Sequence, residues 1–210
     1  MTPSILACGI LGMTVNASLK WDSHINAVTS KATKRLWFLK ELKWAGVDKE
    51  DLAYFFQAVV RPILEYACPA WHTSLTKEQS KKLEDIQSRA LQIIVGNVPY
   101  EEACYMLDFP SLAEIRLDMC ETLFKQIACE SHVLHYLLPA KRDAELTCHM
   151  RSMNKYPTVR ARTNCYKNSF VLYALSHFQW HLYVWLYVCM HVSLVMFVLC
   201  MLIQPLAAKF

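Results

Sequence analysis

Between residues 55 and 95, two segments have apolar residues that recur with the period of an α-helix, and a turn separates them. This pattern constrains the fold more than any other stretch. The two apolar faces are Phe55, Val59, Ile63, Leu64 and Tyr66, and then Leu83, Ile86, Gln87, Ala90, Leu91 and Ile94. The first period stops after Trp71, and Thr76-Lys-Glu-Gln79 has the form of a helix-starting capping box. We therefore predict a helical hairpin. The basic residues left for its polar surface are Arg61, Lys81, Lys82 and Arg89.

The composition favours a mainly α fold of modest positive charge. The chain has 210 residues, 54% of them hydrophobic, a formal net charge of +4 and four glycines. So few glycines disfavour Gly-rich phosphate loops and the many tight turns of a sandwich or barrel. The nine cysteines form no Cys-x-x-Cys pair, which indicates buried thiols in a reducing compartment. We expect helical hairpins or a bundle, one short N-terminal strand and a separate apolar C-terminal helix.

The elements before the hairpin follow from local signals. Leu11–Val15 is predicted to form a strand without a partner strand, ending at the turn that starts at Asn16. Asp22 or Ser23 can begin a helix that runs to about Lys43.

Further signals mark the start of the next helix. Gly46 is typical of a C-terminal cap, and Asp48 can begin the following helix. Pro62 predicts a kink in it near Arg61, and Glu65 is placed for an internal ion pair with Arg61, a structural rather than a catalytic role.

The helix expected over residues 22–43 is rich in positive charge. Its basic residues are Lys31, Lys34, Arg35, Lys40 and Lys43. Two interpretations stay open at this point. The helix could contact a phosphate backbone, or the charges could form an ordinary solvated face.

The region after the hairpin predicts two more helices and a loop. Tyr100–Leu107 is expected to be a short helix, and Ser111 with Glu114 forms a second capping box, for a helix that runs to about Leu138. Residues 141–168 are expected to be an extended basic loop. Its cations and tyrosines suit single-stranded nucleic acid or a flexible linker: Lys155, Arg160, Arg162 and Lys167 with Tyr156 and Tyr166.

Leu182–Ile203 contains 22 residues without a formal charge. As a helix it would extend roughly 33 Å, enough to cross the hydrocarbon core of a bilayer. It would then anchor the chain by its tail, with the N-terminal bulk in the cytosol. The alternative is that a decayed coding sequence reads through into flanking DNA that encodes apolar residues by chance.

Several sequence segments resemble the region downstream of the polymerase core in LINE-type non-LTR retrotransposon reverse transcriptases, and they occur in the same order as in that family. They are LGMTVNASLKWDSHINAVTSKATKRLWFLKELK, RPILEYACPAWHTSLT with LEDIQSRALQII, YEEACYMLDFPSLAEIRLDMCETLFKQI and, weakly, YPTVRARTNCYKNSFVLYAL. The resemblance covers Leu11 to about Gln179. It implies domains of 1–21 as a residual palm strand, 22–138 as a thumb-like helical domain, 139–179 as a basic linker and 180–210 as an apolar tail.

The resemblance also implies a function. In an intact enzyme this region would bind an RNA/DNA template–primer duplex, inside the nucleus or cytoplasm, unless the tail inserts in a membrane. The residues expected at phosphates or in support of them are Lys31, Lys34, Arg35, Lys40, Lys43, Arg61 and Arg89, with Arg116 in that surface or the core. The alternative class is a small tail-anchored membrane protein that acts as an interaction module.

Enzyme chemistry is not expected from this chain alone. Polymerisation in that family needs paired palm aspartates to hold two metal ions, and the sequence has no Asp-Asp pair. The first part also resembles a short segment labelled after AlkB-type alkylation-repair proteins, but no His-x-Asp begins a dioxygenase triad. A zinc site from Cys129, His132 and His135 has no standard spacing. We therefore assign no catalytic residue, metal or cofactor.

Overall fold

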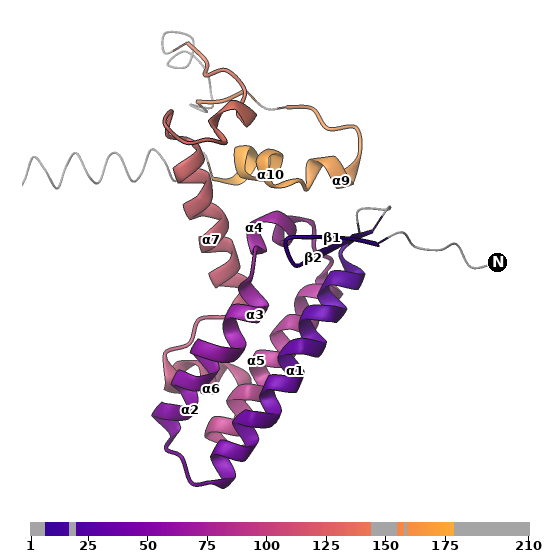
Figure 1. Ribbon diagram of the computed structural model, residues 1–210. Helices are drawn as coiled ribbons and strands as arrows, with labels where there is room; N and C mark the ends of the chain where they lie inside the picture. The colour runs from indigo at the N-terminus through magenta and orange to yellow at the C-terminus, as the bar shows by residue number, and fades with distance from the viewer. Residues whose placement is uncertain (1–6, 17–19, 144–154, 158, 179–210) are drawn as a thin grey trace, which may run out of the picture. The chain divides into compact units, whose positions relative to one another are not determined.

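A computed structural model of the chain describes residues 7–16, 20–143, 155–157 and 159–178 (Figure 1). The protein is mainly helical, which confirms the predicted class. It divides into two units, which are described separately below. Unit 1 is Met1–Leu123 with Ala161–Phe170, and unit 2 is Phe124–Arg160 with Val171–Phe210.

The described elements are short except for three helices. In chain order they are β1 (Ala7–Ile10), β2 (Met13–Asn16), α1 (Asp22–Trp44), α2 (Lys49–Phe55), the π-helical turn η1 (Phe56–Val60), α3 (Arg61–Glu65), α4 (Cys68–Trp71), the 3-10 turn η2 (His72–Ser74), α5 (Lys77–Val95), α6 (Tyr100–Leu107), α7 (Leu112–Ile127), the 3-10 turn η3 (His135–Leu137), α9 (Asn164–Lys167) and α10 (Phe170–His177).

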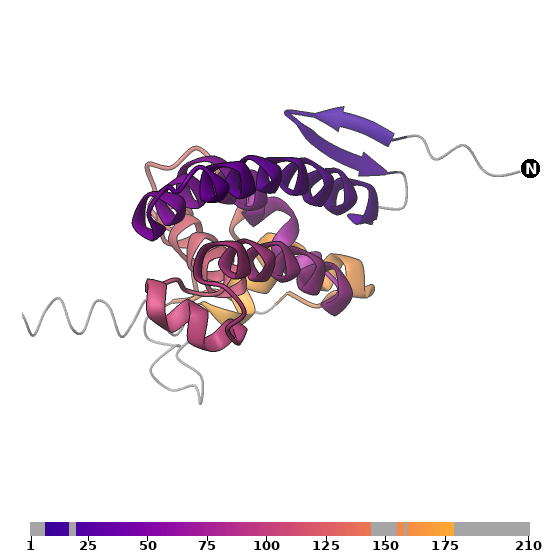
Figure 2. The same cartoon turned by 90° about the horizontal axis from the view of Figure 1, so that it is seen from below.

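Helices α1 and α5 lie side by side and form the centre of unit 1 (Figures 1 and 2). They run in the same direction, because Asp22 near the start of α1 contacts Gln79 and Lys43 near its end contacts Ile93. Their buried residues include Ile25, Ala32, Leu36 and Leu39 from α1, and Leu83, Ile86, Ala90 and Ile94 from α5. Each such leucine or isoleucine contributes on the order of 1.5–3 kcal/mol by leaving water.

Polar contacts fix both ends of this helix pair. The predicted capping box of α5 is confirmed: Thr76 Oγ1 accepts from the Gln79 amide (3.2 Å), and Gln79 Oε1 accepts from the Thr76 amide (2.9 Å). The remaining Nε2 group of Gln79 donates to Asp22 Oδ1 at 2.7 Å. At the other end, Lys43 Nζ donates to the carbonyls of Ile93 and Ile94, the last turn of α5. A cation is favourable there because the helix C-terminus is negative.

The end of α1 confirms the role predicted for Gly46. Its φ of 84° lies in the left-handed region, and its amide donates to the Lys43 carbonyl (3.1 Å). The next amide, of Val47, donates to the Leu42 carbonyl (3.2 Å), which completes a Schellman motif.

The helix before the turn is interrupted near the predicted kink. Its apolar face agrees with the prediction at Leu64, is displaced by one residue before it, and does not include the exposed Tyr66. Its buried residues are Leu52, Phe56, Val60 and Leu64, whereas Phe55, Val59 and Ile63 are half-buried. In an α-helix a step of four residues overshoots one turn by about 40°. The wider π turn η1 offsets this drift just before Pro62, which keeps a four-residue row on one side. The predicted Arg61–Glu65 ion pair is present.

The N-terminal strand is not an orphan, contrary to the prediction. Strand β2 pairs antiparallel with β1, which the sequence analysis missed, through a two-residue turn at Leu11 and Gly12. Both turn residues have positive φ (48° and 80°), as a type I′ turn requires, but Leu11 is not a typical residue for it. Two hydrogen bonds hold the hairpin to the helices of unit 1. Tyr66 Oη donates to the Leu11 carbonyl (2.9 Å), and Nδ1 of the buried His24 accepts from the Thr14 amide (3.3 Å).

Helix α7 begins as predicted but ends earlier. The second capping box is confirmed, since the Ser111 amide donates to Glu114 (2.9 Å) and the Glu114 amide donates to Ser111 Oγ (3.2 Å). The prediction that the helix continues to Leu138 is wrong, because α7 ends at Ile127. His135 Nδ1 donates to the Ile127 carbonyl (2.9 Å), so this side chain takes the place of the next helical amide.

In unit 2, Phe124 packs against Phe178, with ring centroids 6.2 Å apart. Tyr156 is fully buried, so of the two alternatives left open for this loop, stacking of nucleobases on this ring does not fit the structure. The loop expected over residues 141–168 also contains the short helix α9, capped by Thr163. The exposed cations of that region are divided between the units, with Arg160 in unit 2 and Arg162 and Lys167 in unit 1.

The predicted apolar tail, Leu182–Ile203, lies outside the described residues. Among the helices that are described, none combines the length and the apolar character that a bilayer crossing requires.

The Gln79–Asp22 contact predicts a specific stability effect. Gln79→Glu keeps the capping box but places a carboxylate against Asp22, so we expect a loss of about 1–2 kcal/mol in the free energy of unfolding. The double variant Gln79→Glu/Asp22→Asn removes the repulsion and should recover most of that loss. Urea denaturation measures both, and additive effects of the two substitutions would contradict the contact.

Candidate nucleic-acid interface

A polar groove runs between α1 and α5 on the surface of unit 1. It consists of two adjoining hollows of about 360 and 340 Å³, which share Thr33 and Arg89. We call the first the N-terminal hollow, because Asn26 and Lys82 line it, and the second the C-terminal hollow, because Trp37 and Lys40 line it. Both hollows lie within one unit, so the groove is a feature of a single packed pair of helices.

The groove is lined by cations, neutral polar groups and apolar side chains, with one carboxylate. The cations are Lys34, Lys40, Lys82 and Arg89, and the carboxylate is Asp85. Asn26 accepts from Lys82 Nζ through its side-chain oxygen (3.5 Å), which leaves its NH₂ group as a donor. By contrast, the hydroxyl groups of Thr29 and Thr33 donate to the carbonyls one turn earlier in α1, both at 2.8 Å. The donors available to an anion are therefore mainly the ammonium, guanidinium and amide groups.

The structure brings together three of the residues predicted to meet phosphates. Lys34, Lys40 and Arg89 line the groove. Lys31 and Arg35 are exposed but line neither hollow. At about 100° per residue, both fall outside the side of α1 that carries Asn26, Thr33 and Trp37.

The other two predicted residues have partners inside the fold. The ammonium of Lys43 binds the last carbonyls of α5, and the guanidinium of Arg61 pairs with Glu65. Both contacts stabilise helices. Lys43 and Arg61 therefore have structural roles beside the predicted phosphate-binding surface and are not part of the groove.

The prediction missed Lys82, Asn26 and Gln92 as groove residues. Lys82 was assigned to the polar surface of the hairpin, but periodicity alone does not show that this surface lies beside α1. One signal was available in α1. Asn26, Ser30, Thr33 and Trp37 recur at intervals of four, three and four residues, which is a polar stripe beside the apolar one.

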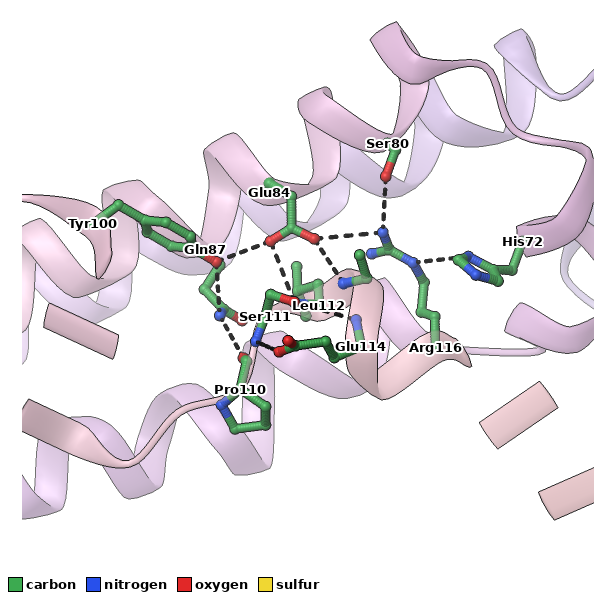
Figure 3. A network of polar contacts seen from close by, with 11 residues as sticks. His72, Ser80, Glu84, Gln87, Tyr100, Pro110, Ser111, Leu112, Glu114 and Arg116 are labelled. Carbon is green, nitrogen blue, oxygen red and sulfur yellow. Dashed lines mark hydrogen bonds and ion pairs between the residues drawn. The ribbon is translucent and has the colours of Figure 1, made fainter. Parts of the chain in front are cut away.

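A second polar cluster lies where α5 meets α6 and α7 (Figure 3). Glu84 of α5 accepts from the amides of Ala113 (2.7 Å) and Leu112 (3.3 Å) and from Tyr100 Oη (2.9 Å). Its carboxylate also pairs with Arg116 Nη2 at 3.5 Å. Glu84 therefore caps the N-terminus of α7 from a different helix.

Arg116 was expected either in the phosphate-binding surface or in the core. It is fully buried, so it belongs to the core. Its Nη2 donates to Ser80 Oγ (3.2 Å) and its Nε donates to His72 Nδ1 (3.4 Å). Its Nη1 has no hydrogen-bond partner among the described residues. The guanidinium thus joins η2, α5 and α7.

Burial sets the protonation states in this cluster. Burial, and then the charge of Arg116, lower the pKa of His72 to about 4, so its Nδ1 is a neutral acceptor at pH 7. Burial, and then the charge of Glu84, raise the pKa of Tyr100, which keeps its hydroxyl a donor. For the nearby Cys68 a hydrogen bond from Cys120 lowers the pKa, burial opposes this by raising it, and the charge of Arg116 lowers it further. Since Glu84 accepts from groups on α6 and α7, we assign this cluster to holding those helices.

Comparison with protein-family models, curated proteins and solved structures finds no match for this chain. Within the described ranges, no three histidine, cysteine, aspartate or glutamate side chains are grouped to hold a metal ion. Cys148 and His149, which could extend the set at Cys129, lie outside those ranges.

The capping role of Glu84 predicts a large penalty for a small substitution. Glu84→Gln replaces an acceptor with a donor beside buried amides and leaves Arg116 unpaired, so we expect a loss of about 2–4 kcal/mol. Glu114→Gln at the same helix end is the matched control. A glutamine at this position of a capping box still accepts, so its loss in urea denaturation should be much smaller than that of Glu84→Gln. Equal losses would contradict the assignment.

His72 predicts a fall in stability in mild acid. Its pKa is lower in the folded protein than in the unfolded chain, so the unfolded chain binds the proton first as pH decreases. Stability should therefore fall between about pH 6.5 and pH 4, by at most roughly 3 kcal/mol from this group. His72→Gln keeps an acceptor that does not titrate and should flatten this part of the profile. A profile identical to that of the unsubstituted protein would contradict the role of His72.

Proposed function

We propose that the groove between α1 and α5 binds the sugar-phosphate backbone of nucleic acid. The observation that carries the proposal is the convergence of Lys34, Lys40, Lys82 and Arg89 from two helices on one continuous groove. Four cations against one carboxylate give this groove a local positive charge that the net charge of +4 alone does not reveal. Such an arrangement neutralises phosphates and releases their counterions.

The sequence resemblance gives the biological setting of this proposal. In a LINE-type reverse transcriptase, a helical region after the palm would contact an RNA/DNA template–primer duplex, and this chain would be its non-catalytic part inside the cell. Phosphate contacts position a nucleic acid without reading its sequence, which suits a polymerase that copies any template. The alternative of a tail-anchored membrane protein depends on Leu182–Ile203, outside the described residues.

Charge reversal within the groove tests the proposal. The variant Lys34→Glu/Lys82→Glu should lower the affinity for an RNA/DNA duplex on the order of ten- to a hundredfold at low salt. The slope of log K against log salt should decrease by about two, since each lost phosphate contact contributes about 0.9. Fluorescence anisotropy over a salt series measures both.

The matched control is Lys31→Glu/Arg35→Glu, which makes the same change in net charge at two residues of α1 that do not line the groove. It should retain most of the affinity and the full salt slope. All four positions are exposed, so both variants should unfold at the same temperature as the unsubstituted protein. Equal weakening by the two variants would show a non-specific charge effect and refute the groove as the site.

A further inference from the structure

The two hollows of the groove differ in chemistry. The N-terminal hollow is lined by amide, hydroxyl and charged side chains, with Ile86 as its apolar member. The C-terminal hollow contains Leu36, Ile93 and the indole of Trp37, with Lys40 and Arg89 as its cations and Gln92 as its amide. A phosphate fits the first composition but would lose its hydration against the apolar side chains of the second.

Trp37 has an aromatic neighbour although much of it is exposed. Its side chain lies on α1 with 57% of its surface accessible. The neighbouring Phe38 contacts it edge to face, with ring centroids 5.0 Å apart and planes at 74°. Such a contact restricts the indole and lowers the entropy that a ligand would lose on stacking.

The C-terminal hollow therefore suits a flat aromatic group that is covalently linked to an anionic backbone. Arg89 lines both hollows, so a phosphate bound by this residue would leave the attached base beside Trp37. Base–aromatic stacking accepts every nucleobase, and the Gln92 amide offers both a donor and acceptors to a base edge. In a duplex both faces of each internal base are already stacked, so an internal base pair does not fit this description.

We infer that the C-terminal hollow binds the base of an unpaired nucleotide, stacked on Trp37, next to the backbone held in the N-terminal hollow. This inference rests on the proposed function and specifies its substrate as nucleic acid with a single-stranded end. The groove would then bind at the junction between a duplex and its overhang.

The test compares a blunt RNA/DNA duplex with the same duplex carrying a single-stranded overhang that contains 2-aminopurine. With the unsubstituted full-length chain, the overhang should increase affinity, and 2-aminopurine fluorescence should be quenched on binding. Trp37→Ala should abolish the quenching and weaken binding of the overhang substrate on the order of ten- to a hundredfold. Its effect on blunt-duplex binding should be much smaller than its effect on the overhang substrate.

Two control variants separate stacking from general effects. Trp37→Phe keeps an aromatic ring and should retain most of the overhang preference. Trp44→Ala removes an indole that is 80% exposed on the same helix but does not line the hollow, so it should behave as the unsubstituted protein. Loss of the preference in Trp44→Ala, or its persistence in Trp37→Ala, would overturn the inference.

The outcome also distinguishes this inference from the proposed function. If Lys34→Glu/Lys82→Glu weakens both substrates while Trp37→Ala changes neither, only the nucleobase pocket is refuted. If neither variant changes binding of either substrate, the groove itself is refuted as a nucleic-acid site.

Discussion

The parallel packing of α1 against α5 is the constraint on which the rest of unit 1 depends. Parallel helices place like ends of their dipoles together, so their packing needs support at the termini. Gln79 supplies it at one end through Asp22, and Lys43 supplies it at the other through the last carbonyls of α5. With both ends held, the polar flanks of the two helices face each other along the groove. The positions of Lys34 and Lys82 follow from that alignment.

Helix α5 also connects this groove to the remainder of the unit. Its side away from α1 carries Glu84, which caps α7 and pairs with the buried Arg116. A carboxylate that is largely removed from water is costly unless it is well bonded, and here backbone amides, a phenol and a guanidinium satisfy it. The same helix thus has an apolar row, a solvated flank that lines the groove and a half-buried carboxylate that positions its neighbours.

The helix caps were predictable from the sequence, because each cap depends on residues that lie close together in the chain. The capping boxes at Thr76 and Ser111 and the cap at Gly46 are confirmed, since each is a contact within a few residues. The turn at Leu11 lacks an Asn-Gly or Asp-Gly signal, so strand β1 was missed. The π turn keeps Leu52, Phe56, Val60 and Leu64 in one row at a constant spacing of four, which periodicity analysis based on a regular α-helix does not anticipate.

The site was only partly predictable, for a different physical reason. Periodicity places Lys34 nearer to Lys31 than to Lys40 around α1, and it does not indicate which side of the helix lies beside α5. That choice depends on contacts between residues 50 or more positions apart in the chain, such as those of Gln79 with Asp22 and of Lys43 with Ile93. The burial of Arg116 likewise depends on Glu84 from another helix.

Lysine footprinting of the unsubstituted protein tests the central claim most directly. The chain would be acetylated with and without an RNA/DNA duplex that carries an overhang, and each lysine quantified by mass spectrometry. The groove account predicts protection of Lys34, Lys40 and Lys82, while Lys31 on the same helix stays reactive. Protection of Lys31 to the same extent as Lys34, or no protection of any groove lysine at saturating nucleic acid, would contradict it.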